Sequence, residues 1–490
     1  MARHVVVVGG GNAALCAAIS ARESGAQVTL LERAPFDLRG GNTRFTAGAM
    51  RSVYAGVDDL VRLMPDLTPA EIERTDFSNY SAADFFDDLG RVTQYRCDPA
   101  LAERLVNDSF ATLQWMQSHG VRFLPLYGRQ SFNVDGRVRF WGGLTIEAWG
   151  GGPGLVDALT EGAQRIGVAL RYGVRAIALT MRSGRVVGVR IRHEGREEPI
   201  DADAVILASG GFESNPAWRA RYLGPGWDLA RVRGTRFNTG DGIRMAVDVG
   251  AATRGHWSGC HAVGWDANAP EFGDLGVGDG FQKHSYPFGI MVNTAGKRFV
   301  DEGADFRNYT YAKYGREILA QPGQIAWQIF DAKVAHLLRD EYRIRQVTRV
   351  AADSIGALAD ELEGIDASEF RATVNAFNAA IDRSAPFDPT RKDGRGTRGL
   401  ALPKSNWANP LDTPPFEAYG VTCGITFTFG GLHVDADARV ISEDGEPIGG
   451  LYAAGELVGG LFYFNYPGGT GLTSGAVFGR RAGVGAAKET

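Results

Sequence analysis

Cysteine is scarce in this chain, and its few cysteines do not form a cluster. Four cysteines occur among 490 residues, and they stand far apart, at Cys16, Cys97, Cys260 and Cys423. No Cys-x-x-Cys pair or Cys/His group is present, which excludes a zinc site, an iron–sulfur cluster or an attached haem of the usual spacing. Such a low density also argues against a disulfide framework, so we expect no metal and a reducing, cytoplasmic setting.

Long hydrophobic runs and a strong charge of one sign are also missing. No apolar stretch approaches the roughly 20 residues that span a bilayer, and the opening MARHVVVVGGG lacks the apolar core and cleavage site of a signal peptide. The formal net charge is -5 and the basic residues are scattered, which argues against a nucleic-acid partner and against a polybasic membrane patch. We expect contact with a membrane only through another protein.

Glycine, by contrast, is abundant, and the chain is long. Its 66 glycines fall in clusters flanked by apolar runs, which is typical of structured loops. With 490 residues, 44% of them hydrophobic, two domains are expected. The pattern changes between residues 257 and 386, where strand-like pieces give way to two helices that Ser354 and Asp366 can cap. We predict a doubly wound, Rossmann-like α/β domain, residues 1–256 and 387–490, with an inserted α+β capping domain at 257–386.

The clearest local pattern is a strand–helix–strand unit at the start of the chain. An apolar β-branched run, His4–Val8, is followed by GGGNAA and by a helical stretch over residues 13–24, which Gly25 ends. A second strand is predicted at Gln27–Glu32. Further strands are predicted at residues 170–174, 186–192 and 204–208.

This unit carries a dinucleotide-binding motif. Gly9, Gly11 and Ala14 form G-x-G-x-x-A between strand and helix, and Glu32 ends the next strand. The first glycine permits the tight turn, the second lets the backbone approach a pyrophosphate, and the small alanine lets helix and strand pack closely. The helix N-terminus offers free N–H groups to the phosphates, and Glu32 can accept from ribose hydroxyls. The sequence therefore predicts a bound dinucleotide.

Three segments together are similar to the fumarate reductase and succinate dehydrogenase flavoprotein superfamily, over essentially the whole chain. They are VVVGGGNAA, GGNTRFTAGAM and GLYAAGELVGG…GLTSGAVFGRRAG. Three more resemble FAD-dependent tricarballylate dehydrogenases: HWSGCHAVGWD, GKRFVDEGADFRNYTYAKYG and FYFNYPGGTGLTSGA. This likeness implies FAD in the domain made of the chain ends, substrate between that domain and the cap, and oxidation of a citrate-like tricarboxylate to an aconitate. It also implies a separate electron-transfer protein that can be membrane-associated.

The resemblance also implies which residues contact the cofactor. In succinate dehydrogenases a histidine of the second glycine-rich loop attaches FAD, but this loop has Asn42, Thr43 and Arg44, so we expect noncovalent FAD. The residues expected to contact FAD are Gly9, Gly11, Asn12, Ala13, Ala14, Glu32, Arg33, Gly41, Asn42, Thr43, Gly48, Val174, Gly210, Asp241, Gly455, Glu456, Gly471, Leu472 and Thr473. The last three begin a predicted helix, whose N–H groups can favour an anionic, reduced flavin.

The predicted substrate site departs from that of the fumarate reductases. Their proton-transferring arginine corresponds to Phe306, with Arg307 one residue later, while Phe427 and Tyr466 replace a carboxylate-binding histidine and arginine. His261 does match a substrate-binding histidine. The NYPGG stretch also resembles 3-ketosteroid dehydrogenases, in which the matching tyrosine acts on a ketone. The residues expected to contact substrate are His261, His284, Arg307, Phe427, Tyr466 and Gly468.

The reaction needs a base, and several side chains could supply it. Flavin dehydrogenation aligns a substrate C–H with flavin N5 while a base removes a proton from the neighbouring carbon. Arg307 is the first candidate, although the pKa of arginine is about 13.8 and must be lowered for this role. Alternatively, Arg307 pairs with a substrate carboxylate or with Asp305, and Tyr309, Tyr311 or Tyr466 is the base. His261 is a further candidate catalytic residue.

Three functions remain open from the sequence. The first is a dehydrogenase for a small anionic polycarboxylate. The second is a flavin dehydrogenase for a hydrophobic ketone or acid, favoured by aromatic residues such as Phe427 and Phe462. The third is a flavin-binding scaffold or electron-transfer subunit without chemistry of its own. Two or more arginine or lysine side chains in the pocket would support the first, and an aromatic-walled pocket would support the second.

Overall fold

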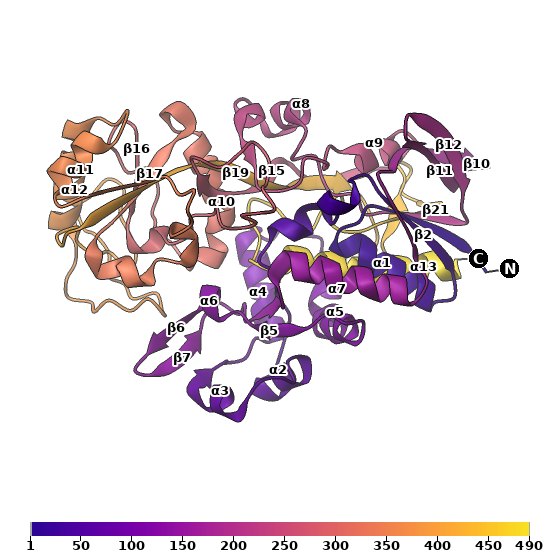
Figure 1. Ribbon diagram of the computed structural model, residues 1–490, viewed down its shortest axis with the longest axis horizontal. Helices are drawn as coiled ribbons and strands as arrows, with labels where there is room; N and C mark the ends of the chain where they lie inside the picture. The colour runs from indigo at the N-terminus through magenta and orange to yellow at the C-terminus, as the bar shows by residue number, and fades with distance from the viewer. Residues whose placement is uncertain (1, 490) are drawn as a thin grey trace.

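The fold is described by a computed structural model covering residues 2–489. Figure 1 shows an elongated molecule in which two sheets lie toward opposite ends, with the long strand β19 (Phe416–Leu432) running between them. Both termini lie beside the first sheet, at the end where α1 and α13 are labelled. Among residues 2–489, no helix combines the length and the apolar character needed to cross a membrane.

The first sheet has six strands and draws on both ends of the chain. Its order is β20 (Arg439–Ile441), β21 (Pro447–Ala453), β13 (Ala204–Leu207), β1 (His4–Val8), β2 (Gln27–Glu32) and β9 (Ala169–Tyr172). Strand β1 lies parallel between β13 and β2, and its Val5–Val8 side chains are buried, which explains the continuous apolar run. The predicted strand–helix–strand unit is therefore confirmed, and Gly25 follows its helix with a φ of 93°.

Helices α1 (Asn12–Glu23) and α13 (Thr470–Lys488) pack tightly against each other beside this sheet. A Cβ atom on Gly479 would lie 2.4 Å from the carbonyl oxygen of Ala13, and one on Gly483 equally close to that of Ala17. These glycines therefore let two helix backbones come into direct contact. The packing brings the N-termini of both helices, far apart in the sequence, to one place.

The second sheet is centred on β19. Its order is β14 (Arg231–Val232), β19, β17 (Ala326–Phe330) and β16 (Ile290–Asn293), and both β15 (Thr253–Asp266) and β18 (Arg349–Ala352) also pair with β19. Helices α11 (Ile355–Glu361) and α12 (Ala367–Ala380) share a buried apolar cluster with it. The side chains of Ser354 and Asp366 cap these helices, as predicted.

The remaining elements surround the two sheets. Strands β10 (Arg175–Arg182), β11 (Arg185–His193) and β12 (Arg196–Asp201) form one small antiparallel sheet. Two further three-stranded sheets contain β3 (Ala49–Met50), β8 (Ile146–Ala148) and β5 (Phe123–Pro125), and β4 (Thr75–Asp76), β7 (Arg137–Phe140) and β6 (Ser131–Val134). The other helices are α2 (Val57–Leu63), α3 (Pro69–Arg74), α4 (Ala82–Val92), α5 (Pro99–Ser118), α6 (Tyr127–Gln130), α7 (Gly151–Arg165), α8 (Pro216–Trp218), α9 (Asp241–Val247) and α10 (Tyr311–Leu319).

The mixed α/β architecture agrees with the predicted fold class. Strand β19 falls in the range assigned to the first domain, yet it is the central strand of the second sheet. The division into residues 1–256 with 387–490 and residues 257–386 stays a prediction.

Candidate active site

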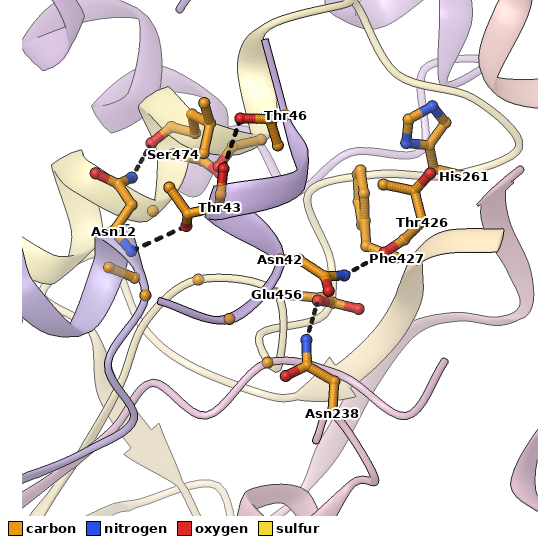
Figure 2. A pocket seen from close by; sticks show the side chains of 18 of the residues that line it. Asn12, Asn42, Thr43, Thr46, Asn238, His261, Thr426, Phe427, Glu456 and Ser474 are labelled. Atoms are coloured by element: carbon orange, nitrogen blue, oxygen red, sulfur yellow. Dashed lines mark hydrogen bonds between the residues drawn. The ribbon is translucent and has the colours of Figure 1, made fainter. Parts of the chain in front are cut away.

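One long cavity runs from the first strand–helix unit toward the second sheet, and most of the predicted site residues line it. Figure 2 shows Asn12, Thr43 and Ser474 on one side of this pocket and His261 with Phe427 on the other. The predicted cofactor residues that line it are Gly9, Gly11, Asn12, Ala13, Glu32, Arg33, Gly41, Asn42, Thr43, Val174, Gly210, Asp241, Gly455, Glu456, Gly471 and Leu472. The predicted substrate residues that line it are His261, His284, Arg307, Phe427, Tyr466 and Gly468.

Four predicted residues lie outside the cavity lining. Ala14 is fully buried inside α1, and Gly48 turns the chain with a φ of 71° beside the backbone of Gly151. The hydroxyl of Thr473 donates to the Gly469 carbonyl within its own helix, at 3.3 Å. The hydroxyl of Tyr309 donates to the Asp88 carboxylate, on the side of α4. The structure therefore does not bring Tyr309 to the other candidate catalytic residues.

The first end of the cavity has the features that a dinucleotide requires. Gly9 has a φ of 120°, and a Cβ atom there would lie 2.2 Å from the carbonyl oxygen of Ala208, so only glycine fits. Helix α1 begins after Gly11, which supplies no side-chain cap; the N–H of Asn12 donates to the Thr43 hydroxyl at 3.0 Å, and the next N–H groups of the first turn can bind a phosphate. The buried Glu32 carboxylate accepts from the N–H of Ala34 at 2.7 Å, and burial raises its pKa to about 7. These groups fit the pyrophosphate and ribose of FAD.

Arg33 and Asp241 line the cavity but are already bound within the protein. The Asp241 carboxylate accepts from Arg175 Nε at 2.8 Å and from Arg33 Nη1 at 3.2 Å. Arg33 Nη1 also donates to the hydroxyl of Thr239. These contacts connect the end of β2 to the first turn of α9, so Arg33 and Asp241 contribute to the structure of the cavity wall.

Asn42 joins the second glycine-rich loop to the rest of the cavity wall. Its side-chain amide donates to the carbonyl of Thr426 at 2.6 Å, as Figure 2 shows. The amide also donates to the carboxyl of Glu213 at 2.7 Å, and Asn42 Oδ1 accepts from the N–H of Thr235 at 2.8 Å. Asn238 bridges Glu213 and Glu456 in the same wall. Sequence reasoning missed Glu213, which follows Gly210 by three residues.

The N-terminus of α13 forms another part of the wall. Its N-cap, Gly469, has a φ of 81° and supplies no side-chain cap, and Gly471 and Leu472 of its first turn line the cavity. Arg51 is fully buried behind this turn, where its Nε donates to the Gly468 carbonyl at 2.9 Å. Arg51 therefore places its guanidinium beside the helix terminus, where a positive charge reinforces the helix dipole, and the Asp88 carboxylate, 3.6 Å from Nη1, offsets part of that charge. Sequence reasoning missed this residue.

The far end of the cavity is lined by three arginines and one carboxylate. Arg233 and Arg129 both pair with Asp279, at 2.6 and 2.8 Å. Arg307 donates to the backbone carbonyl of Arg129 and has no carboxylate partner within 4.0 Å among residues 2–489. Sequence reasoning missed Arg129 in α6, Arg233 directly after β14, and Asp279 in the loop after β15.

Two histidines stand among these groups. Both ring nitrogens of His261 are buried without a hydrogen-bond partner in the part of the chain described. His284 Nδ1 faces Arg307 Nη1 at 3.3 Å, and because arginine can only donate, His284 carries its proton on Nε2. Burial, followed by nearby arginines, lowers the pKa of both rings well below the usual value, so both are neutral. Free histidine nitrogens in a cavity are available to a ligand.

Aromatic side chains form another part of the cavity wall. The hydroxyls of Tyr311 and Tyr466 are hydrogen-bonded to each other, and the ring of Phe427 packs edge-on against Tyr466 and His261. Burial raises the pKa of both tyrosines, so the pair is neutral. Phe429 and Phe462 extend this wall. The cavity thus has a cationic side and an aromatic side.

A Rossmann-like sheet, a glycine-lined dinucleotide end and a polar far end together define a flavoprotein oxidoreductase. The chain matches the family model described as FAD binding domain over residues 4–472. It is 30% identical over 500 residues to a probable fumarate reductase of Shewanella frigidimarina, covering 99% of this chain and 75% of that protein. The chain belongs to this FAD-binding family, within the fumarate reductase and succinate dehydrogenase flavoprotein superfamily.

Further similarities bear on the reaction. A 3-oxosteroid 1-dehydrogenase of Mycobacterium tuberculosis is 30% identical over 347 residues, which cover 65% of this chain and 60% of that protein. The solved structure of the open conformation of a flavocytochrome c3 fumarate reductase matches with a TM-score of 0.74 and 27% identity, covering 99% of this chain and 78% of that one. The protein is an FAD-dependent oxidoreductase that acts on CH–CH groups, which confirms the predicted cofactor and reaction class.

Proposed function

We propose that this protein dehydrogenates a small polycarboxylate, of the tricarballylate kind, to the corresponding alkene. The observation that carries the proposal is the excess of positive charge at the far end of the cavity. Arg129, Arg233 and Arg307 line it with Asp279 as the one carboxylate among the lining residues there. Buried charges without a counterion are costly, so such a site favours a ligand that brings carboxylates.

The charge excess persists when the groups just behind the lining are included. Arg339 is buried beside a second, smaller cavity that Arg307 and His284 also line, and Glu341 lies near these arginines. Burial raises the pKa of Glu341, but Arg129, Arg339 and Arg307 together bring it below its usual range, so Glu341 is ionised. With Arg129, Arg233, Arg307 and Arg339 all protonated, the two carboxylates Asp279 and Glu341 leave two positive charges; with Arg307 deprotonated, as its role as base requires, one remains. A substrate that brings carboxylates would compensate this excess.

The protein's own groups would bind the substrate and move its proton. Bound FAD supplies the two-electron hydride acceptor. Arg307 is the proposed base: burial is the main cause that lowers its pKa, and the nearby Arg129 lowers it further. The Nε2–H of His284 and the free nitrogens of His261 are proposed to bind substrate oxygens, while the Tyr311 and Tyr466 hydroxyls are the alternative proton acceptors. Arg307 would return its proton to solvent after the reaction.

The electrons are proposed to pass to a separate electron-transfer protein, which can be membrane-associated, and the protein itself to act in the cytoplasm. The sequence pattern supports the first part, because its four cysteines provide no ligand set for a haem or an iron–sulfur cluster. An isolated enzyme should therefore complete one reductive half-reaction and then need an added electron acceptor to turn over.

A second candidate is the dehydrogenation of a cyclic ketone. The aromatic side of the cavity, with Phe427, Phe429, Phe462 and Tyr466, supports it, as does the similarity to a 3-oxosteroid 1-dehydrogenase. In this reading the Tyr466 hydroxyl, held by Tyr311, would donate to the ketone oxygen. A ketone would leave the positive charge of the arginines uncompensated, which is why this candidate stands second.

The two candidates separate in one anaerobic titration of the purified holoenzyme. Tricarballylate, a citrate-like acid and a Δ4-3-ketosteroid are added in turn while the visible flavin absorption is followed. Bleaching by the tricarboxylate, lost in Arg307→Met and kept in the control Arg371→Met on α12, which does not line the cavity, is the expected result. Bleaching by the ketosteroid alone would overturn the polycarboxylate proposal and direct attention to Tyr466. No bleaching by any compound that binds would favour the scaffold function.

A further inference from the structure

Two glutamates lie side by side in the wall of the FAD cavity. Glu213 follows β13 and is fully buried, and Glu456 follows β21 and lines the cavity itself. One amide joins them, because Asn238 Nδ2 donates to Glu213 Oε1 at 2.7 Å and to Glu456 Oε2 at 3.4 Å. Figure 2 shows the second of these hydrogen bonds. Both carboxyl groups therefore lie within reach of one amide nitrogen, which places them next to each other.

No positive charge compensates this pair. Among residues 2–489, no lysine, arginine or histidine lies within 4.0 Å of either carboxyl group. The charged group that approaches from the neighbouring segment is Arg219, and its guanidinium donates to four backbone carbonyls, those of Glu213, Trp227, Asp228 and Ala230. Two adjacent carboxylates in a buried, unpaired position cannot both be ionised, so the pair must hold at least one proton.

The hydrogen-bond donors show which oxygen carries that proton. Glu456 Oε1 accepts from the backbone N–H of Thr428 at 2.9 Å and also receives the N–H of Gly211, and such donors stabilise an anion. Glu213 Oε1 accepts from the amides of Asn42 and Asn238, whereas Glu213 Oε2 is buried and receives no donor. A proton on Glu213 Oε2 would satisfy both this oxygen and the facing carboxylate of Glu456. Burial raises the pKa of both groups, and the charge of Glu456 raises that of Glu213 further.

We propose that Glu213 and Glu456 form a proton-sharing pair, in which neutral Glu213 donates a hydrogen bond to Glu456 and holds its carboxylate as an acceptor for a hydroxyl group of FAD. Glu213 is then a positioning residue, since it does not line the cavity and acts only through Glu456. Loss of the shared proton at high pH would place two negative charges side by side and weaken cofactor binding. This inference depends on FAD binding and is independent of the substrate class.

The matched variants are Glu213→Gln and Glu213→Leu. Glutamine has the shape of a protonated glutamate and can place its amide N–H where the proton sits, while its oxygen still accepts from Asn42 and Asn238. Leucine removes the donor and leaves both amides without an acceptor. We therefore expect FAD affinity within threefold of wild type for the glutamine variant, and at least tenfold weaker for the leucine variant, at neutral pH. The affinity of the wild type should fall with rising pH, and that of the glutamine variant should stay level.

Infrared spectroscopy of the holoenzyme identifies the proton directly. The wild type should show the carbonyl stretch of a buried, protonated carboxylic acid, shifted in heavy water, and Glu213→Gln should lack it. Far-ultraviolet circular dichroism establishes that each variant is folded. A wild-type minus Glu213→Gln difference spectrum without this band, or a band that disappears only in Glu456→Gln, would overturn the assignment; the difference spectrum removes the contribution of Glu32, whose pKa burial raises to about 7. The proposal would also be overturned if the glutamine variant released FAD as readily as the leucine variant. That result would mean that a hydrogen-bond donor at this position does not contribute to FAD binding.

Discussion

Replacing Arg307 by methionine tests the proposed base, and the structure predicts that this substitution costs little stability. The guanidinium is buried and bonds only to the carbonyl of Arg129 and to His284, both neutral partners. Its removal therefore leaves no buried carboxylate without a counterion. One lost hydrogen bond to a carbonyl costs about 1–3 kcal/mol, and the removed cation relieves the repulsion from Arg129. The unfolding free energy should fall by no more than about 2 kcal/mol, while catalysis falls much further.

The size of the catalytic loss distinguishes the roles. A positioned base contributes typically about 10²–10⁴-fold, which corresponds to about 3–5.5 kcal/mol of activation free energy. Anaerobic stopped-flow measurement of flavin reduction by tricarballylate gives both the limiting rate and the substrate dissociation constant. If Arg307 is the base, the limiting rate drops by that factor in Arg307→Met. If it only binds a carboxylate, the dissociation constant rises and Arg307→Lys restores much of the affinity. A limiting rate within threefold of wild type in the methionine variant would refute the base role.

Three further predictions concern the cofactor end. Gly9→Ala should abolish FAD retention, because its Cβ would lie 2.2 Å from the Ala208 carbonyl oxygen, and this is checked by flavin absorbance after gel filtration. In the apoprotein the pKa of Glu32 is about 7, above its unfolded value of about 4.3, so thermal stability should fall as pH rises from about 4.5 to about 7. Glu32→Gln should flatten that slope. Arg51→Met should lower the flavin midpoint potential and weaken sulfite binding to the flavin, because a positive charge near the flavin is lost. Arg51→Lys should restore both properties. An unchanged potential in Arg51→Met would show that the charge of Arg51 does not affect the flavin.

The fold was predictable where buried strands form continuous apolar runs and where a helix is capped by a residue directly before it in the sequence. β1, β2 and both capped helices of the second sheet follow from such short patterns. Strand β12, by contrast, was missed, because REEPID contains one apolar side chain besides proline and its residues are mostly exposed. It is held as a strand by its backbone pairing with β11 and not by burial of a hydrophobic face. A composition-based reading cannot detect an edge strand of that kind.

The two ends of the cavity differ in predictability for a physical reason. The dinucleotide end depends on backbone approach, which requires glycines at fixed spacing within a few residues, so the motif is visible in one stretch of sequence. The far end depends on side chains from separate elements. Arg129, Arg233 and Asp279 meet only after α6, β14 and the loop beyond β15 have packed, and single arginines at these positions have no periodic signal. Tyr311 was considered as a base, but its hydrogen bond to Tyr466 required the structure.

The positions of the arginines change how Phe427 and Tyr466, the aromatic residues at the substrate end, are interpreted. The resemblance to the fumarate reductases leads one to expect a histidine and an arginine where this chain has Phe427 and Tyr466, as if the carboxylate-binding charge had been lost. The structure shows positive charge elsewhere in the lining of the same cavity, from Arg233 and Arg307. A ligand with carboxylates can pair with these arginines, whereas an uncharged ring would leave their charge unpaired. The cavity therefore supports the proposed polycarboxylate over an uncharged ketone, even though the expected histidine and arginine are absent.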